Sequence, residues 1–199
     1  VPQTEFRKTK QMIIDENHTF KIVFIGRLEE IKGVHLLIEA MQELRKKYFV
    51  ELEIVGYGTE EENLESLCKK LGVNDIVHFA GMQREIGKYL KTADIFVYPS
   101  ICEEVFGISL VEAMSYGVPC VANEVGGIPE IIANHENGVL TKEKTGLAVA
   151  EAIESLIQSY RDGKADEMAE KCYETAQYFS IDHTVEGLEK CYLELLNKN

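Results

Sequence analysis

The sequence predicts an α/β fold in which a parallel sheet is covered by helices on both faces. Short apolar runs that are typical of buried strands alternate with segments whose apolar residues recur at helical spacing. The composition is that of a globular domain, with 45% hydrophobic and 28% charged residues. The length of 199 residues is enough to bury one substantial core. Because strands that alternate with helices are joined by right-handed crossovers, we expect residues 1–199 to form one domain around a parallel sheet.

The expected elements follow a polar lead-in over residues 1–19. Apolar runs predict strands at residues 21–25, 50–55, 76–79, 94–99, 119–122 and 137–140. The first helix is indicated by the helical spacing of Val34, Leu37, Ile38, Met41 and Leu44. The second begins near Thr59, which forms a capping-box pattern with Glu62. Further helices are expected at residues 85–91, at residues 108–116, and from residue 145 to the end, with breaks near Gly163 and Ser180.

Charge and cysteine content exclude several classes of protein. The formal net charge is −13, which argues against a nonspecific nucleic-acid binder because such a protein needs a basic face. Any anionic ligand must therefore be held by a few local cations. The five cysteines form no Cys-x-x-Cys pair, and neither a secretory signal nor a membrane-length apolar run occurs, so we expect free thiols and a cytoplasmic location. The chain starts at Val1, and we expect it to be a piece of a longer protein.

The loop after the first strand places two cations where a parallel sheet binds ligands, at the carboxyl ends of its strands. Its sequence is GRLEEIKGV, residues 26–34, and its glycines are too far apart for a dinucleotide fingerprint. Arg27 and Lys32 are suited to hold phosphate oxygens. The alternative is a solvated pair of cations that meets Glu29 and Glu30.

The loops after the second, third and fifth strands give weaker signals. Gly56 and Gly58 permit backbone conformations closed to other residues, although an ordinary turn explains them better. The turn at residues 80–85 could offer backbone groups to a planar base, and the loop at residues 123–132 could border the same crevice.

The stretch SICEEVFGISLVEAMSYG, residues 100–117, places acids beside an apolar helix. Gly107 precedes the helix, and unpaired N–H groups near Ile108 and Ser109 would favour a phosphate. Glu112 sits in the second turn of that helix, where a charge must be paired, hydrogen-bonded or given to a ligand. The alternative for Glu112 is a structural hydrogen bond to a nearby loop.

Several chemistries have no sequence signature. The chain lacks a Gly-x-Ser-x-Gly elbow, a phosphate-loop motif and an Asp-x-Asp pair, and its five histidines show no metal-ligand spacing. We therefore expect neither a metal nor another cofactor. A bound diphosphate would depend on Arg27, Lys32 and the helix start.

Taken in chain order, four segments resemble the glycosyl transferases group 1 family, specifically the donor-binding C-terminal half of retaining enzymes with the GT-B fold. These segments are GRLEEIKG, EVFGISLVEAMSYGVPCVA, VGGIPEII and NGVL. The resemblance covers nearly the whole chain and implies a Rossmann-like domain that binds a nucleotide sugar. It also implies that an N-terminal acceptor domain is absent.

The resemblance implies a role for each motif residue. Arg27 and Lys32 would hold the nucleotide diphosphate and stabilise its charge, so that Arg27, Lys32 and Glu104 are the candidate catalytic residues. Glu104 would contact the donor sugar and Glu112 the ribose. Spacing selects Glu104 over Glu103, because the family motif separates its two glutamates by seven residues.

Backbone groups complete the implied donor site. Those of Gly107, Ile108 and Ser109 would meet phosphate or sugar, and the loop at Met82 and Gln83 would lie against the base. The resemblance also implies donor contacts at Gly26 and Gly56. Val105 departs from the family, in which many members have glycine.

The activity implied is transfer of a hexose from a nucleotide diphosphate sugar, such as a UDP-sugar, to an acceptor hydroxyl with retained configuration. Polysaccharide or glycolipid biosynthesis is the implied setting, with the missing domain as partner and peripheral membrane association of the longer protein. The final segment, residues 182–196, resembles the helix that crosses back to that domain and could expose apolar residues: Val185, Leu188, Cys191, Tyr192 and Leu195. The alternative is a stand-alone nucleotide-sugar-binding module that needs a second chain for catalysis. A phosphorylase is disfavoured, since no segment marks a pyridoxal-phosphate lysine, and an epimerase is disfavoured because epimerases lack this arrangement of two cations and two glutamates.

Overall fold

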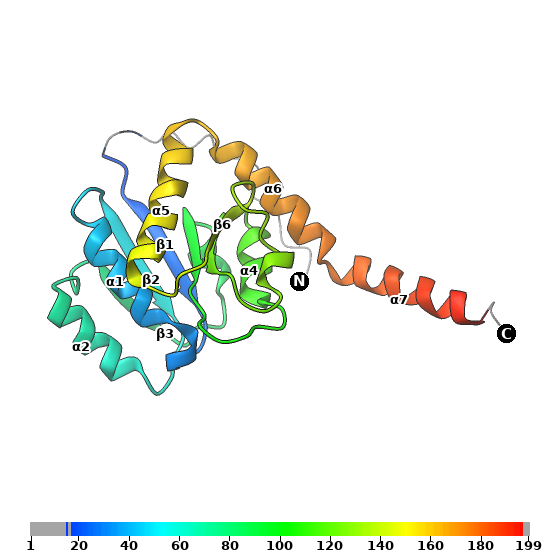
Figure 1. Cartoon of the computed structure of the whole chain (residues 1–199), viewed down its shortest axis with the longest axis horizontal. Coiled ribbons are helices and arrows are strands. Elements are labelled where there is room, and N and C mark those ends of the chain that lie inside the picture. Colours follow the sequence, from blue (N-terminus) through cyan, green and yellow to red (C-terminus); the bar gives the residue numbers. More distant parts are fainter. Residues whose placement is uncertain (1–14, 16, 197–199) are drawn as a thin grey trace.

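The computed structural model describes residue 15 and residues 17–196, so most of the expected lead-in lies outside the described residues. In this part of the chain six parallel strands form one sheet in the order β3-β2-β1-β4-β5-β6 (Figure 1). The strands are β1 (Phe20–Ile25), β2 (Val50–Val55), β3 (Val77–Gly81), β4 (Ile95–Tyr98), β5 (Cys120–Asn123) and β6 (Gly138–Thr141). The parallel sheet is the one that the alternating pattern predicts, whereas its doubly wound strand order was not predicted.

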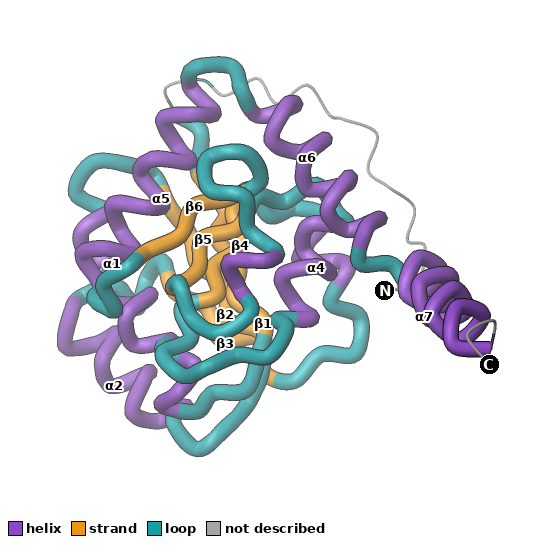
Figure 2. The backbone as a smooth tube through the Cα atoms, turned by 45° about the vertical axis from the view of Figure 1, so that its right-hand side comes forward, coloured by secondary structure: helices purple, strands orange, loops and turns teal. Residues whose placement is uncertain are grey.

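Helices cover both faces of the sheet (Figure 2). One face is covered by α1 (Val34–Leu44), α2 (Glu61–Leu71) and α5 (Gly146–Arg161). The other is covered by α3 (Gly87–Leu90), α4 (Ile108–Met114) and α6 (Ala165–Tyr178). Two short 3₁₀ turns, η1 (Glu30–Lys32) and η2 (Ile128–Glu130), follow β1 and β5. The predicted breaks near Gly163 and Ser180 separate α5, α6 and α7 (Ile181–Leu196).

Strands β1, β4, β5 and β6 divide their apolar side chains between two cores, because successive residues of a strand point to opposite faces. In β1, Ile22 and Phe24 join the core under α1 and α5, and Val23 joins the core under α4. The five apolar residues predicted for α1 are all buried in the first core. Both faces of the sheet are therefore sealed by this chain's own helices.

The predicted capping box at the start of α2 was wrong. The helix begins at Glu61 after Glu60, and no side chain caps it. The N–H of Glu60 instead donates to the Leu28 carbonyl oxygen, and Gly58 packs so closely that a Cβ there would overlap the same carbonyl. Packing against the residues after β1 thus shapes the loop, so that Glu60 and not Thr59 directly precedes the helix.

The chain reverses its direction of winding between β1 and β4, which are neighbours in the sheet although β2 and β3 lie between them in the sequence. Loops after these two strands diverge to opposite faces and open a crevice at the carboxyl edge.

Helix α7 projects away from this body (Figure 1). None of its residues is buried, and its apolar residues Val185, Leu188, Tyr192 and Leu195 are exposed, as the sequence predicted. In the described residues, no helix has both the length and the apolar character needed to span a membrane.

Candidate functional site

A cleft of about 650 Å³ opens at the carboxyl ends of β1 and β4. Its lining comprises Phe24, Ile25, Gly26, Arg27, Lys32, Tyr98, residues 103–109, and Glu112. Residues from the loop after β1 thus face residues from the loop after β4 and from the first turns of α4. The crevice predicted from strand order therefore brings together the candidate residues of two separate motifs.

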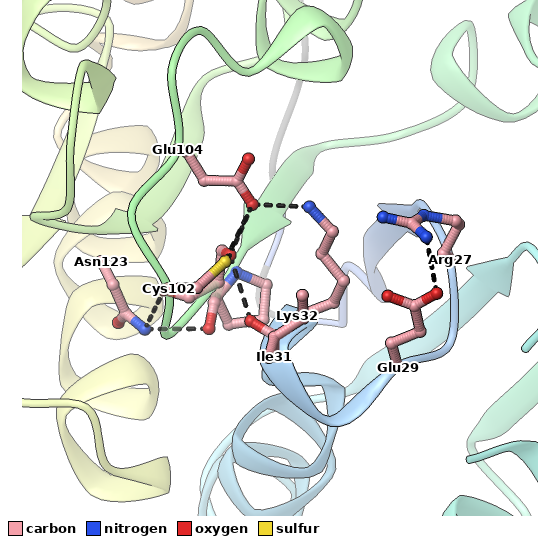
Figure 3. A network of polar contacts seen from close by, with 9 residues as sticks. Arg27, Glu29, Ile31, Lys32, Cys102, Glu104 and Asn123 are labelled. Atoms are coloured by element: carbon pink, nitrogen blue, oxygen red, sulfur yellow. Dashed lines mark hydrogen bonds and ion pairs between the residues drawn. The ribbon is translucent and has the colours of Figure 1, made fainter. Parts of the chain in front are cut away.

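Lys32 and Glu104 form an ion pair inside the cleft (Figure 3). The Lys32 Nζ lies 2.5 Å from Oε1 of Glu104, and each side chain is 15% exposed. Lys32 also lies over the Tyr98 ring, 5.7 Å from its centroid. A pair so withdrawn from water interacts more strongly than a surface pair, and it holds the Lys32 charge where an anion can reach it.

The environment of Glu104 keeps its carboxylate charged. Burial alone would raise its pKa, but hydrogen bonds from Lys32 and Ser100, with the Lys32 charge, lower the pKa below its usual value. The neighbouring Tyr98 side chain lowers the pKa of Glu104 further. Burial and the neighbouring Glu104 charge raise the pKa of Tyr98, so that its hydroxyl stays protonated and can donate. Glu104 is therefore an acceptor of hydrogen bonds and not a proton donor near neutral pH.

Arg27 lies at the mouth of the cleft and is more loosely held. Its Nη1 donates to Oε1 of Glu29 at 2.6 Å, and its side chain is 64% exposed. The solvated pair considered from the sequence is thus present with Glu29. Exposed pairs of this kind contribute about 0–1 kcal/mol, so an arriving phosphate can replace Glu29 at little cost.

Glu112 lines the cleft from the second turn of α4. No side chain or backbone donor in the described part of the chain hydrogen-bonds to its carboxylate. Its main-chain oxygen accepts from Ser115 Oγ. Burial raises the pKa of Glu112. The structural hydrogen bond considered as an alternative is therefore not found within the described part of the chain, which leaves the carboxylate open to a ligand there.

The start of α4 borders the same cleft. Gly107 has φ of 72°, in the left-handed region, and a Cβ there would overlap Ile128 and Leu110 side chains. The backbone of Gly107, Ile108 and Ser109 lines the cleft. The glycine thus allows the chain to turn sharply into the helix beside Glu104.

Gly56, Met82 and Gln83 lie outside the residues that line the cleft. Gly56 has φ of 151°, and a Cβ there would overlap the Gly26 carbonyl oxygen, so its close packing against the cleft wall explains a glycine. Met82 is exposed on the loop after β3, while Gln83 donates to the Ala80 carbonyl oxygen. Their contact with a base stays a prediction.

Sequence reasoning missed the polar residues beneath Glu104. Ser100 is buried and donates to Oε1 of Glu104 at 2.6 Å. Asn123 is buried and donates to the carbonyl oxygens of Pro99 and Ser100 (Figure 3). Thr141 donates to Asn123 in turn. The available signal was Asn123, a polar residue that ends an otherwise apolar strand.

Metal-ligating groups do not gather in the described residues, where no cluster of three or more His, Cys, Asp or Glu side chains is arranged to hold an ion. All five cysteines are free, as expected. Burial raises the pKa of Cys68 to about 11 and raises that of Cys120 well above its usual value, so both thiols are core groups.

A family model described as glycosyl transferases group 1 matches residues 6–178. The chain belongs to the glycosyl transferases group 1 family. An uncharacterized glycosyltransferase of Methanocaldococcus jannaschii is 32% identical over 181 residues, which cover 89% of this chain and 46% of that protein. This group 1 chain therefore spans about half the length of the curated relatives it matches.

Solved structures confirm the fold of this group 1 chain. The Anabaena protein HepE, crystallised with UDP, superposes with a TM-score of 0.81 and 26% identity over 88% of this chain and 49% of HepE. The C-terminal domain of a glycosyl transferase group 1 family protein from Francisella tularensis gives a TM-score of 0.71 and 28% identity over 80% of this chain and 85% of that domain. The chain thus has the Rossmann-like fold found as one half of GT-B glycosyltransferases.

Proposed function

We propose that this chain is the donor-binding half of a glycosyltransferase that takes a hexose from a nucleotide diphosphate sugar. The observation that carries the proposal is that Arg27, Lys32, Glu104 and Glu112 all line one cleft, at the switch between β1 and β4. Two cations there can meet a diphosphate, and two carboxylates can accept hydroxyl groups. HepE, a relative in fold, was crystallised with UDP and with UDP-glucose.

We assign each residue of the cleft to a part of the donor from its position and its present hydrogen bonds. Arg27 leaves Glu29 to grip phosphate oxygens in two-pronged fashion, and Lys32 adds its charge from deeper in the cleft. Glu112, whose carboxylate has no hydrogen-bond partner among the described residues, accepts the ribose hydroxyls. Glu104 accepts a hydroxyl of the donor sugar, and the backbone at Gly107, Ile108 and Ser109 lies against the phosphate or the sugar.

Transfer with retained configuration is the proposed outcome in the longer protein. Glu104 is a poor general base because Lys32 and Ser100 hold it as a hydrogen-bonded carboxylate. The acceptor hydroxyl therefore gives its proton to the leaving diphosphate, on the face from which the new bond forms. Arg27 and Lys32 stabilise the charge that develops on the leaving group, and this electrostatic effect supplies most of the rate.

The proposal includes no metal or other cofactor, because Arg27 and Lys32 can neutralise the diphosphate. The partner is an N-terminal acceptor domain, since the relatives are about twice as long as this chain. Polysaccharide or glycolipid synthesis, and peripheral association of the longer protein with a membrane, belong to the same proposal.

Substitution in the full-length protein tests the assignment. Arg27→Ala and Glu104→Ala are each expected to lower kcat/KM by about 100-fold or more, because each removes a contact to the donor. Arg161→Ala is the matched control, since Arg161 stacks over Tyr48, away from the cleft. Wild-type transfer rates in the Arg27 and Glu104 variants would refute the proposal.

A stand-alone binding module is the second candidate. It is favoured because this chain, about half as long as its relatives, supplies all the residues that line the cleft. Calorimetry on the chain with UDP and UDP-glucose, followed by a product assay, separates the two candidates. Binding without turnover, even with the longer protein's other half added, fits a module. Transfer by the chain alone excludes it.

A further inference from the structure

Ser100 is a buried hydroxyl that the proposed donor contacts do not use. It is 1% exposed, and its Oγ lies 2.6 Å from Oε1 of Glu104 and 3.1 Å from the Ile31 carbonyl oxygen. Both neighbours are acceptors, and a hydroxyl has one proton to give. The Ile31 carbonyl already accepts the Ile101 N–H at 2.9 Å. Because the contact to Glu104 is shorter and its acceptor is charged, the Ser100 hydroxyl donates its proton to Glu104.

A polar network from the ends of neighbouring strands fixes the position of Ser100. Asn123 ends β5, and its Nδ2 donates to the carbonyl oxygens of Pro99 at 2.9 Å and Ser100 at 3.0 Å. Thr141 ends β6, and its Oγ1 donates to Oδ1 of Asn123 at 2.6 Å. A buried network whose members are all hydrogen-bonded is rigid. Asn123 therefore fixes the main chain of Ser100, while the side chain of Ser100 holds Glu104.

The two oxygens of Glu104 have different surroundings. Lys32, Ser100 and Cys102 all donate to Oε1, at 2.5, 2.6 and 3.7 Å. Figure 3 shows the second oxygen turned away from these three donors. The main chain is fixed as well, because the Gly127 N–H donates to the Glu104 carbonyl oxygen at 2.7 Å.

We propose that Ser100 is a positioning residue that anchors Oε1 of Glu104 and thereby presents Oε2 to a hydroxyl of the donor sugar. The inference rests on the proposed function, in which Glu104 contacts the sugar. Without the Ser100 proton, the carboxylate is free to turn both oxygens toward the Lys32 ammonium. The sugar then loses its acceptor, while the diphosphate contacts of Arg27 stay intact.

The test compares ligands with and without a sugar on the 199-residue chain, which has its own core on each face of its sheet. Affinities for UDP, UDP-glucose and UDP-N-acetylglucosamine are measured by calorimetry for wild type and Ser100→Ala. The variant should bind the better UDP-sugar about tenfold more weakly, and UDP within about twofold of wild type. Ser100→Cys has a side chain of similar size that is a weaker donor, so its affinity for the UDP-sugar should lie between those of wild type and Ser100→Ala. Ser159→Ala removes a hydroxyl that donates within α5 and should change neither affinity.

A second readout needs no ligand. Nuclear magnetic resonance of the labelled Glu104 carboxyl follows its titration, with Lys32, Tyr98 and Cys102 facing it unchanged. Loss of the Ser100 hydrogen bond should move that titration to higher pH in Ser100→Ala. Equal titrations, or equal loss of UDP and UDP-sugar affinity, would overturn the role of Ser100. Failure of the wild type to bind any of the three ligands would instead refute the proposed function, and the titration would still decide whether Ser100 anchors Glu104.

Discussion

Replacement of Lys32 by methionine tests how strongly the cleft depends on its ion pair. Methionine keeps an unbranched apolar stem and removes only the ammonium, which lies 2.5 Å from Glu104. A hydrogen bond between charged groups contributes about 1.5–3 kcal/mol when buried, and the 15% exposure of both side chains moderates this. We expect the free energy of unfolding to fall by about 2 kcal/mol at pH 7, which lowers Tm by about 4–8 °C for a domain of this size.

The pH dependence gives this prediction its sharpest form. Because the pKa of Glu104 is lowered in the folded chain, its charge stabilises the fold above the unfolded pKa, and this stabilisation is lost as pH falls through the folded value. The difference in stability between wild type and Lys32→Met should therefore be largest near neutral pH. It should disappear below about pH 4, where Glu104 becomes protonated.

Thermal unfolding between pH 3 and pH 8, roughly the range in which the carboxylates titrate, measures this difference. Lys47→Met provides the control, because Lys47 pairs with Glu154 at 2.8 Å on the exposed surface, and its Tm should stay near that of wild type. A Tm loss in Lys32→Met that equals that of the control, or that persists unchanged at low pH, would refute the reasoning.

Three further substitutions test other parts of the site. Gly56→Ala places a Cβ against the Gly26 carbonyl at a positive φ, and denaturant unfolding should show a loss of about 2–4 kcal/mol. Equal stability would show that the loop shifts freely. Burial raises the pKa of Glu112, so its charge costs stability as pH rises through that pKa. Glu112→Gln should therefore match or exceed the wild-type Tm at pH 7, yet bind UDP about tenfold more weakly by calorimetry; a lower Tm with unchanged affinity would contradict both expectations. Thr141→Val leaves Oδ1 of Asn123 unpaired and should cost about 1–3 kcal/mol in denaturant unfolding, whereas Thr141→Ser should cost less.

The sequence carried enough information to predict the fold class and the motif residues of the cleft. Hydrophobic periodicity predicted α1 and the six strands, because burial on one face leaves a direct record in the spacing of apolar residues. Periodicity does not record strand order. Lys32 and Glu104 are 72 positions apart, and they meet because β1 and β4 are neighbours in the sheet.

The parts that were missed depend on packing between loops. Ser100 and Asn123 stand beside turns, where serine and asparagine are common for local reasons, so nothing in the pattern joins them to Glu104. The capping box at Thr59 failed for a related reason, since contact with the Leu28 carbonyl decided where α2 begins. Residues whose partners are distant in sequence need the fold before their roles can be assigned.

The acidity of the cleft has a consequence for how fast a donor arrives. Three carboxylates, Glu103, Glu104 and Glu112, share the lining with two cations, Arg27 and Lys32, on a chain of net charge −13. The long-range field therefore repels an approaching diphosphate, although the local cations bind it. Salt screens such repulsion over a Debye length of about 10 Å at 0.1 M. Stopped-flow measurements with a fluorescent UDP derivative should show association that quickens as ionic strength rises, opposite to the behaviour of enzymes that draw in anions by electrostatic steering.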